Sequence, residues 1–135
     1  EICPIVPVGI RSLSFEESEL IKERKLKTFW AKDIVDNDTW FDDAISRLSG
    51  NVYITIDLDA FDPSIMPSVG TPEPGGFGYY QVLRFLKKVC EKRNVVGFDV
   101  VELCPNEKDV SSDFTAARLI YKLIGYKFWK KKLRN

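Results

Sequence analysis

The run NVYITIDLD, residues 51–59, constrains this chain more than any other feature of its sequence. It is apolar or β-branched at most positions, as expected for a parallel strand covered on both faces. The run ends in two aspartates, Asp57 and Asp59, separated by one residue. Because successive strand side chains point to opposite faces, these two carboxylates are expected to share a face.

A carboxylate pair in this position requires a compensating partner. Two carboxylates held close together at the rim of an apolar sheet repel each other and lose hydration. The nearest basic residues in the sequence, Arg47 and Arg84, fall on predicted helices, so the local sequence supplies no partner. Two divalent cations bridged by carboxylate oxygens would remove the repulsion. The alternative is structural, with one aspartate capping the following loop while the other faces water.

Strand and helix patterns alternate along the chain. This alternation predicts an α/β fold, a mostly parallel sheet with helices on both faces. The carboxyl ends of the strands carry the chemistry in such sheets, and Asp57, Asp59, Asp99 and Glu102 all lie at or near such ends. The predicted strands cover residues 2–10, 27–34, 51–59 and 94–103, and the predicted helices cover residues 14–25, 39–49, 79–93 and 113–128.

Capping residues indicate where two of these helices begin and end. Ser14, with Glu17 three residues later, matches the capping-box pattern at the start of the first helix. Asp38 or Thr39 is expected to cap the second helix, and Gly50 is expected to end it.

The remaining segments have structural interpretations. Residues 60–78 are expected to form a long loop, in which Asp62 before Pro63 is typical of a turn. Asp99, inside a predicted strand, is expected to accept structural hydrogen bonds. The basic tail KFWKKKLRN, residues 127–135, is interpreted as a solvated helix end, which the dipole at a helix C-terminus favours.

Composition narrows the classes of function. Lys plus Arg and Asp plus Glu both number 20, and this balance gives no electrostatic reason to expect nucleic acid or a membrane as partner. No apolar run approaches the roughly 20 residues of a membrane-spanning helix. Cys3, Cys90 and Cys104 are widely spaced, which predicts buried, reduced thiols in a cytoplasmic protein. The sequence has no histidine, the commonest metal ligand and general base near neutral pH.

Two other classes of protein share part of this pattern. A strand ending in DxD resembles the haloacid dehalogenase superfamily, but there a small β-branched residue and Gly usually follow, whereas here the run continues AFDP. An aspartate ending a strand also resembles the receiver domain of response regulators. A receiver needs a second acidic pair after its first strand, and VGIRS, residues 8–12, offers none.

A longer pattern is more selective than the aspartate pair. TIDLDAFDPSIMPSVGTPEPGG, residues 55–76, resembles the signature of the ureohydrolases, a family of arginases, agmatinases and their relatives. GFDVVELCP, residues 97–105, is similar to a later strand of that family, and VGIRS is similar to an earlier one. The segment GTPEPGG, residues 70–76, is most similar to agmatinase-like members of the family.

The resemblance implies a fold and a site. Ureohydrolases have an eight-stranded, mostly parallel α/β sheet with two manganese ions at its carboxyl edge. It implies that Asp57 bridges both ions as a metal-binding and catalytic residue, and that Asp59 binds one ion. Glu102 is then the catalytic residue that binds the substrate guanidinium, and Thr71 lies at the substrate pocket.

The resemblance also implies that part of the site is missing. The family draws further ligands from a histidine-containing GGDH-type segment and a DxHxD cluster, neither of which this sequence contains. Residues 1–135 therefore correspond to the carboxyl-terminal half of a ureohydrolase, without the amino-terminal metal-binding half. The chain opens on EICPIVPVGI without Met, which suggests that residue 1 is not the natural start. The isolated chain is expected to be inactive.

The expected function follows from these points. Completed by its other half, the chain is expected to hydrolyse a guanidino compound, with agmatine favoured, to urea and an amine such as putrescine. The expected cofactor is Mn²⁺, and the expected assembly is a homo-oligomer, a trimer or hexamer. The alternative is a short non-catalytic module that binds or pairs with a partner.

Overall fold

The elements of the chain follow the predicted alternation of strands and helices. A computed structural model describes residues 3–132, with side chains described through residue 128. The elements are, in order, β1 (Val8–Ile10), α1 (Phe15–Glu23), β2 (Phe29–Trp30), α2 (Ala31–Ile34), α3 (Phe41–Ser46), β3 (Asn51–Asp57), the 3₁₀ turn η1 (Leu58–Ala60), α4 (Tyr79–Lys92), β4 (Asn94–Val101) and α5 (Ser111–Lys132).

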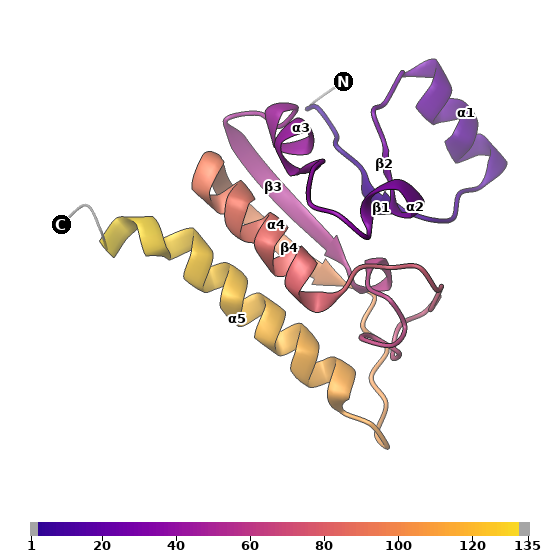
Figure 1. Cartoon of the computed structure of the whole chain (residues 1–135). Coiled ribbons are helices and arrows are strands. Elements are labelled where there is room, and N and C mark those ends of the chain that lie inside the picture. The colour runs from indigo at the N-terminus through magenta and orange to yellow at the C-terminus, as the bar shows by residue number, and fades with distance from the viewer. Residues whose placement is uncertain (1–2, 133–135) are drawn as a thin grey trace.

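The described strands form two separate parallel pairs. β1 pairs with β2, and β3 pairs with β4 from Asn51 opposite Asn94 to Asp57 opposite Val101. The helices α4 and α5 lie side by side along one face of the β3–β4 pair (Figure 1). Parallel strands joined through helices confirm the predicted α/β class.

The main hydrophobic core lies between the β3–β4 pair and its two helices. Ile56 of β3 belongs to it and Val52 of the same strand is also buried, whereas Tyr53 is 60% exposed. Leu119 and Leu123 of α5 are fully buried in the same cluster. The alternation along β3 therefore reflects a strand with one covered face within the described residues, which corrects the prediction that both faces are covered.

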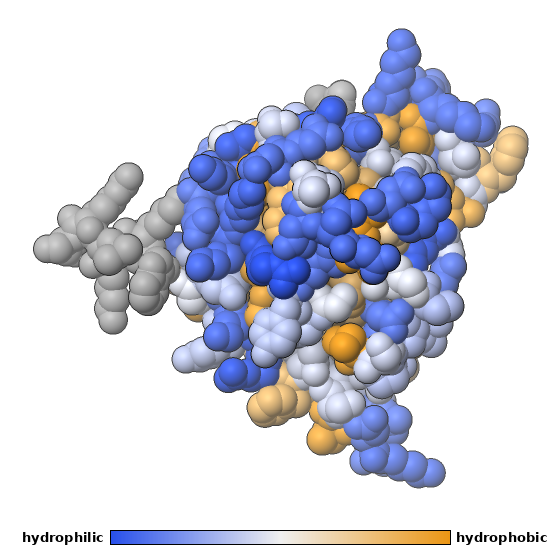
Figure 2. Space-filling model, viewed as in Figure 1, coloured by the Kyte–Doolittle hydropathy of each residue, from blue (hydrophilic) through white to orange (hydrophobic). Residues whose placement is uncertain are grey.

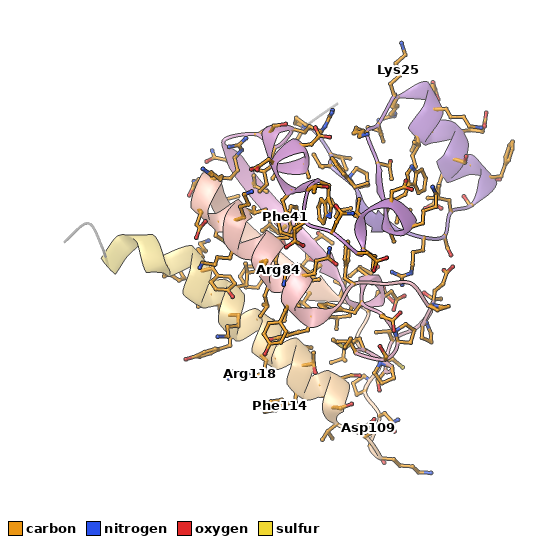
Figure 3. All side chains as sticks on the ribbon, viewed as in Figure 1. Lys25, Phe41, Arg84, Asp109, Phe114 and Arg118 are labelled. Carbon is orange, nitrogen blue, oxygen red and sulfur yellow. The ribbon has the colours of Figure 1, made fainter. Side chains whose placement is uncertain are left out.

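A second, aromatic cluster lies on the other side of α4. The Trp40 ring lies 4.7 Å from the Phe41 ring and 4.6 Å from the Phe85 ring. Phe41 lies between α3 and α4, and the labelled Arg84 projects from α4 (Figure 3). Val82 and Phe85 contact both clusters, so α4 joins the two halves of the structure.

One apolar surface remains exposed on α5. Figure 2 shows hydrophobic side chains near the start of this helix, where Phe114 is 68% exposed and Val110 just before the helix is 66% exposed. No helix within residues 3–132 is long and apolar enough to cross a membrane. The final residues of the basic tail, 133–135, lie outside the described part of the chain.

The structure corrects two of the predicted strands. The first is confined to Val8–Ile10, because the preceding segment contains two prolines that cannot donate to a strand ladder. Residues 27–34 form a strand only at Phe29–Trp30 and then turn into α2. Helical spacing there buries both Ala31 and Ile34. In a continued strand these two residues would lie on opposite faces.

The predicted caps are correct for one helix and wrong for the next. Ser14 Oγ accepts the Glu17 backbone N–H at 3.1 Å, and the Glu17 carboxylate accepts the Ser14 N–H at 2.7 Å, which confirms the capping box. The N-cap of α3 is instead Trp40, with no side-chain cap, and its C-cap is Arg47 rather than Gly50. The Trp40 indole donates to two carbonyls of the preceding turn, so tertiary packing sets this boundary.

The cysteine prediction is correct for one thiol only. Cys90 is buried, whereas Cys3 and Cys104 are exposed, and none of the three forms a disulfide within the described residues. Cys104 lies in an exposed segment after β4, so its thiol is not buried although cysteine is often a buried residue.

Candidate functional site

The two aspartates of the motif lie on either side of a strand end. β3 ends at Asp57, and the chain turns into the 3₁₀ turn η1, which contains Asp59. Asp57 Oδ1 accepts the Asp59 backbone N–H at 2.8 Å and thereby caps the turn. The expectation that the residues share a strand face is wrong, because the strand does not reach Asp59. The structural alternative is correct in that Asp57 caps the turn. Its second part, an aspartate that faces water, is wrong for Asp59, whose Oδ1 is buried.

Asp59 faces the loop that carries the threonine of the motif. Thr71 Oγ1 donates a hydrogen bond to Asp59 Oδ2, across twelve residues of sequence. Asp59 Oδ1 is buried and has no hydrogen-bond partner within the described residues. A buried carboxylate oxygen without a donor favours a ligand that can compensate its charge.

Glu102 approaches the same loop from the end of β4. It adopts a left-handed backbone conformation with φ of 66°, which is uncommon for a residue with a Cβ. Its Oε2 lies 3.5 Å from the place that a Cβ on Gly70 would occupy. The Ser68 carbonyl accepts the Cys104 N–H at 3.0 Å, and Val69 bridges Leu103. These contacts hold the Thr71 segment against the end of β4.

Two residues that sequence reasoning did not select also reach this edge. Arg11, just after β1, donates to the Ala60 carbonyl at 3.1 Å and to the Asp59 carbonyl. Ser12 donates to the Glu73 carboxylate. Arg11 is 48 residues from Asp59, so the sequence around the aspartates gives no sign of this contact. The only available signal was its place in the VGIRS segment.

Asp62 organises the loop that follows, as its position before a proline predicted. Its Oδ1 accepts the Ser64 N–H at 3.0 Å and the Ser64 hydroxyl at 2.6 Å, and its Oδ2 accepts the Gly75 N–H at 2.9 Å. These hydrogen bonds, above all those from Ser64, lower the pKa of Asp62 to about 2. A Cβ on Gly76 would lie 2.4 Å from the Phe61 carbonyl carbon, so the close approach of these two backbone segments requires glycine.

Asp99 has the structural contacts that were predicted for it. Its Oδ2 accepts hydrogen bonds from Tyr53 Oη at 3.0 Å and from Thr55 Oγ1 at 3.3 Å, both on the neighbouring strand. The hydrogen bond to Asp99 raises the pKa of the Tyr53 phenol. Asp99 therefore ties β4 to β3 at a position that precedes the carboxyl edge.

The sheet edge at which β3 and β4 end can supply part of a metal centre. Asp57 and Asp59 provide oxygen ligands of the kind that Mn²⁺ and Mg²⁺ accept. Within the described residues no group of three or more His, Cys, Asp or Glu side chains is arranged to hold a metal ion. The unpartnered Asp59 Oδ1 fits a metal, but the set of ligands is only partial.

The fold, the acidic residues where β3 and β4 end, and a comparison with known families together define the class of this protein. The model of the Arginase family matches residues 3–125, so the chain belongs to the arginase family. The predicted resemblance to ureohydrolases is thereby confirmed.

Particular relatives can be named within that family. The chain is 44% identical over 124 residues to the N(1)-aminopropylagmatine ureohydrolase of Synechocystis, covering 91% of this chain and 40% of the relative. It is 36% identical to an agmatinase of Pyrococcus horikoshii, covering 87% of this chain and 41% of the relative. The chain thus spans about two fifths of the length of these relatives.

Solved structures agree on the fold. The crystal structure of agmatine ureohydrolase from Thermoplasma volcanium matches with a TM-score of 0.78 at 35% identity, over 94% of this chain and 44% of that one. Arginase from Bacillus caldovelox matches with a TM-score of 0.77 at 28% identity, over 92% of this chain and 44% of that one. The arginase-like α/β fold predicted from the motifs is therefore confirmed.

Proposed function

We propose that this chain forms part of a ureohydrolase that converts a guanidino compound to urea and an amine. The observation that carries the proposal is the convergence of Asp57, Asp59, Thr71 and Glu102 on one sheet edge, from three separate segments. Agmatine is the favoured substrate and putrescine the matching amine, because relatives of this chain are named agmatinase and N(1)-aminopropylagmatine ureohydrolase.

Asp57 and Asp59 would hold the metal, which we propose to be a pair of Mn²⁺ ions. A metal pair of this kind supplies a water molecule of lowered pKa when it is bound. Asp57 keeps the turn in place through the Asp59 N–H, while Thr71 fixes the orientation of the Asp59 carboxylate. The remaining ligands would come from polypeptide outside this chain, the predicted amino-terminal half.

Glu102 would bind the substrate. A carboxylate can pair with a planar guanidinium through two parallel, charge-assisted hydrogen bonds, which fixes the orientation of the guanidinium as well as its position. Its left-handed backbone accompanies a carboxylate that lies beside Gly70, with Oε2 3.5 Å from the place that a Cβ there would occupy. The same carboxylate would stabilise positive charge on the substrate as its central carbon becomes tetrahedral.

We further propose that the completed protein is a cytoplasmic homo-oligomer, a trimer or hexamer, and that it uses neither nucleic acid nor a membrane as partner. The balanced charge of the chain supports the second point. The competing proposal is a non-catalytic module derived from a ureohydrolase.

A chimera tests the proposed function. The 124 matched residues of the Synechocystis relative are replaced by this chain, and urea release from agmatine, arginine and guanidinobutyrate is measured with Mn²⁺. We expect Glu102→Gln to lower kcat/KM by about 100-fold or more, the scale of losing one key electrostatic contact. Glu107→Gln, an exposed neighbour, is the matched control and should retain activity. A folded chimera that binds Mn²⁺ but releases no urea from any of these compounds would instead support the non-catalytic module.

A further inference from the structure

Glu73 lies in the Thr71 loop, residues 70–76, but has no part in the chemistry proposed above. It stands between Pro72 and Pro74, and Thr71 stands directly before Pro72. A residue that precedes proline is restricted to an extended backbone, and each proline fixes its own φ. The two prolines therefore limit the conformations open to Glu73 in a loop that belongs to neither a helix nor a strand.

A closed series of contacts brings Glu73 to the same sheet edge as Asp59. Thr71 Oγ1 donates to the Asp59 carboxylate, and Ser12 Oγ donates to the Glu73 carboxylate. Arg11, the neighbour of Ser12 in the chain, donates to the Asp59 carbonyl. Because the ends of this series are both at Asp59, the side chains of Thr71 and Glu73 are both directed at the candidate site.

Further contacts hold the other end of the Thr71 loop. Asp62 Oδ2 accepts the Gly75 N–H at 2.9 Å, and the Phe77 N–H donates to the Ala60 carbonyl at 2.9 Å. The loop is therefore held on both sides of Glu73. A carboxylate in such a loop needs little reorganisation to bind a ligand.

The contacts of Glu73 leave its negative charge unpaired. The residue is half-buried, and its carboxylate accepts a hydrogen bond from the neutral Ser12 hydroxyl. Within the described side chains no lysine or arginine forms an ion pair with it. Arg11 directs two of its guanidinium N–H groups to backbone carbonyls instead. A carboxylate in this state favours a cationic ligand.

Glu73 and Glu102 lie at opposite ends of one short segment. Glu102 Oε2 is 3.5 Å from the place that a Cβ on Gly70 would occupy. Gly70 and Glu73 are three residues apart, so their backbones are separated by at most about 11 Å. Agmatine carries a guanidinium at one end of a butyl chain and an ammonium group at the other. Such a ligand can contact both carboxylates at once.

We propose that Glu73 binds the ammonium group at the far end of the substrate and thereby selects guanidino compounds whose other end is cationic. The inference rests on the proposed function, because it takes Glu102 as the group that binds the guanidinium. Guanidinobutyrate carries a carboxylate at its far end, which Glu73 repels. Butylguanidine carries no charge there and gains nothing from Glu73.

The variant Glu73→Gln in the chimera described above tests this role. The glutamine oxygen can still accept the Ser12 hydroxyl, but the negative charge is lost. We expect kcat/KM for agmatine to fall about tenfold or more, mainly through KM, and the affinity for agmatine measured by calorimetry to fall equally. Both quantities should change less than twofold for butylguanidine, and kcat/KM for guanidinobutyrate should rise.

Two further variants separate charge from structure. Ser12→Ala removes the hydrogen bond but keeps the carboxylate, so it should weaken agmatine binding much less than Glu73→Gln does. Glu107→Gln removes an exposed carboxylate outside the Thr71 loop and should leave the ranking of the three compounds unchanged. The unmodified chimera should already bind agmatine at least tenfold more tightly than butylguanidine, and added salt should reduce this difference.

Three results would overturn the proposal: equal losses for agmatine and butylguanidine in Glu73→Gln, no loss for agmatine, or no preference for agmatine in the unmodified chimera. Binding and hydrolysis are read separately. A preference for agmatine that Glu73→Gln abolishes, without urea release, would retain this inference while rejecting the chemistry. Urea release that Glu73→Gln leaves unchanged would reject this inference alone.

This chain by itself supplies a second measurement if the chimera is insoluble. Millimolar agmatine should shift the amide signal of Glu73, whereas butylguanidine should not. Equal shifts from both compounds, or none from agmatine, would count against the proposal.

Discussion

Asp57 combines a structural contact with a proposed chemical role. Its Oδ1 accepts the Asp59 backbone N–H at 2.8 Å, so the side chain helps to form the turn that presents the second aspartate. Replacement by alanine would remove both the turn contact and the charge. Asp57→Asn is the better probe, because the amide oxygen can still accept that N–H while the negative charge is lost.

Asp62 provides a test of the loop that is independent of catalysis. Its folded pKa of about 2 lies below the ordinary value of 3.8, so its charged form is stabilised in the folded loop. This contribution is fully present above about pH 4 and is lost as the pH falls through about 2. We expect the amide proton shifts of Ser64 and Gly75 to titrate with a midpoint of about 2.

The same titration has a matched control. Asp62→Ala should abolish the pH-dependent shift and accelerate amide exchange across residues 62–76, whereas Asp36→Ala, at an exposed aspartate, should leave both unchanged. A Ser64 amide that titrates near 4 would contradict the hydrogen-bond network seen around Asp62.

At the scale of elements, the transition from β3 to η1 decides the geometry of the site. The strand pattern continued through Asp59 in the sequence, yet the structure leaves the strand at Asp57. A local hydrogen bond from the Asp59 N–H to the Asp57 side chain competes with strand pairing and turns the chain. As a result, the Asp59 side chain contacts Thr71 and does not project from a face of the sheet.

The helix α1 illustrates an element that local signals define and packing does not. It has a complete capping box but buries no residue. We expect Ser14→Ala to destabilise the helix by about 1 kcal/mol, seen as faster amide exchange in residues 15–23. The midpoint of global unfolding should hardly move, since α1 contributes no buried side chain to either core. A large drop in that midpoint would mean that α1 stabilises more of the chain than its burial indicates.

At the scale of the whole molecule, the isolated chain is predicted to lack ureohydrolase activity. Two aspartates without histidine are too few to hold two ions at useful affinity. We expect no urea above background from agmatine with Mn²⁺, and no saturable Mn²⁺ binding by calorimetry below the millimolar range. The intact Synechocystis relative serves as the positive control. Urea release by the chain alone that disappears in Asp57→Asn would contradict this prediction.

The sequence by itself determined the family. The signature at residues 55–76 indicated the arginase family because its prolines, glycines and acidic residues stand at specific spacings. The strand β3, the helix α4 and the capping box of α1 followed from local patterns of apolar and hydrogen-bonding residues. Such features depend on neighbours within a few residues, which a sequence displays directly.

Only the tertiary structure decided which distant residues meet. Arg11 and Ser12 reach the site from a segment far away in sequence, and no periodicity could have indicated this. The short strand β2 and the start of α3 were set by packing around Trp40 rather than by propensity. The place of Glu73 beside the site also becomes visible only in the folded chain, through its contact with Ser12. Long-range contacts follow from packing, and packing depends on the whole chain at once.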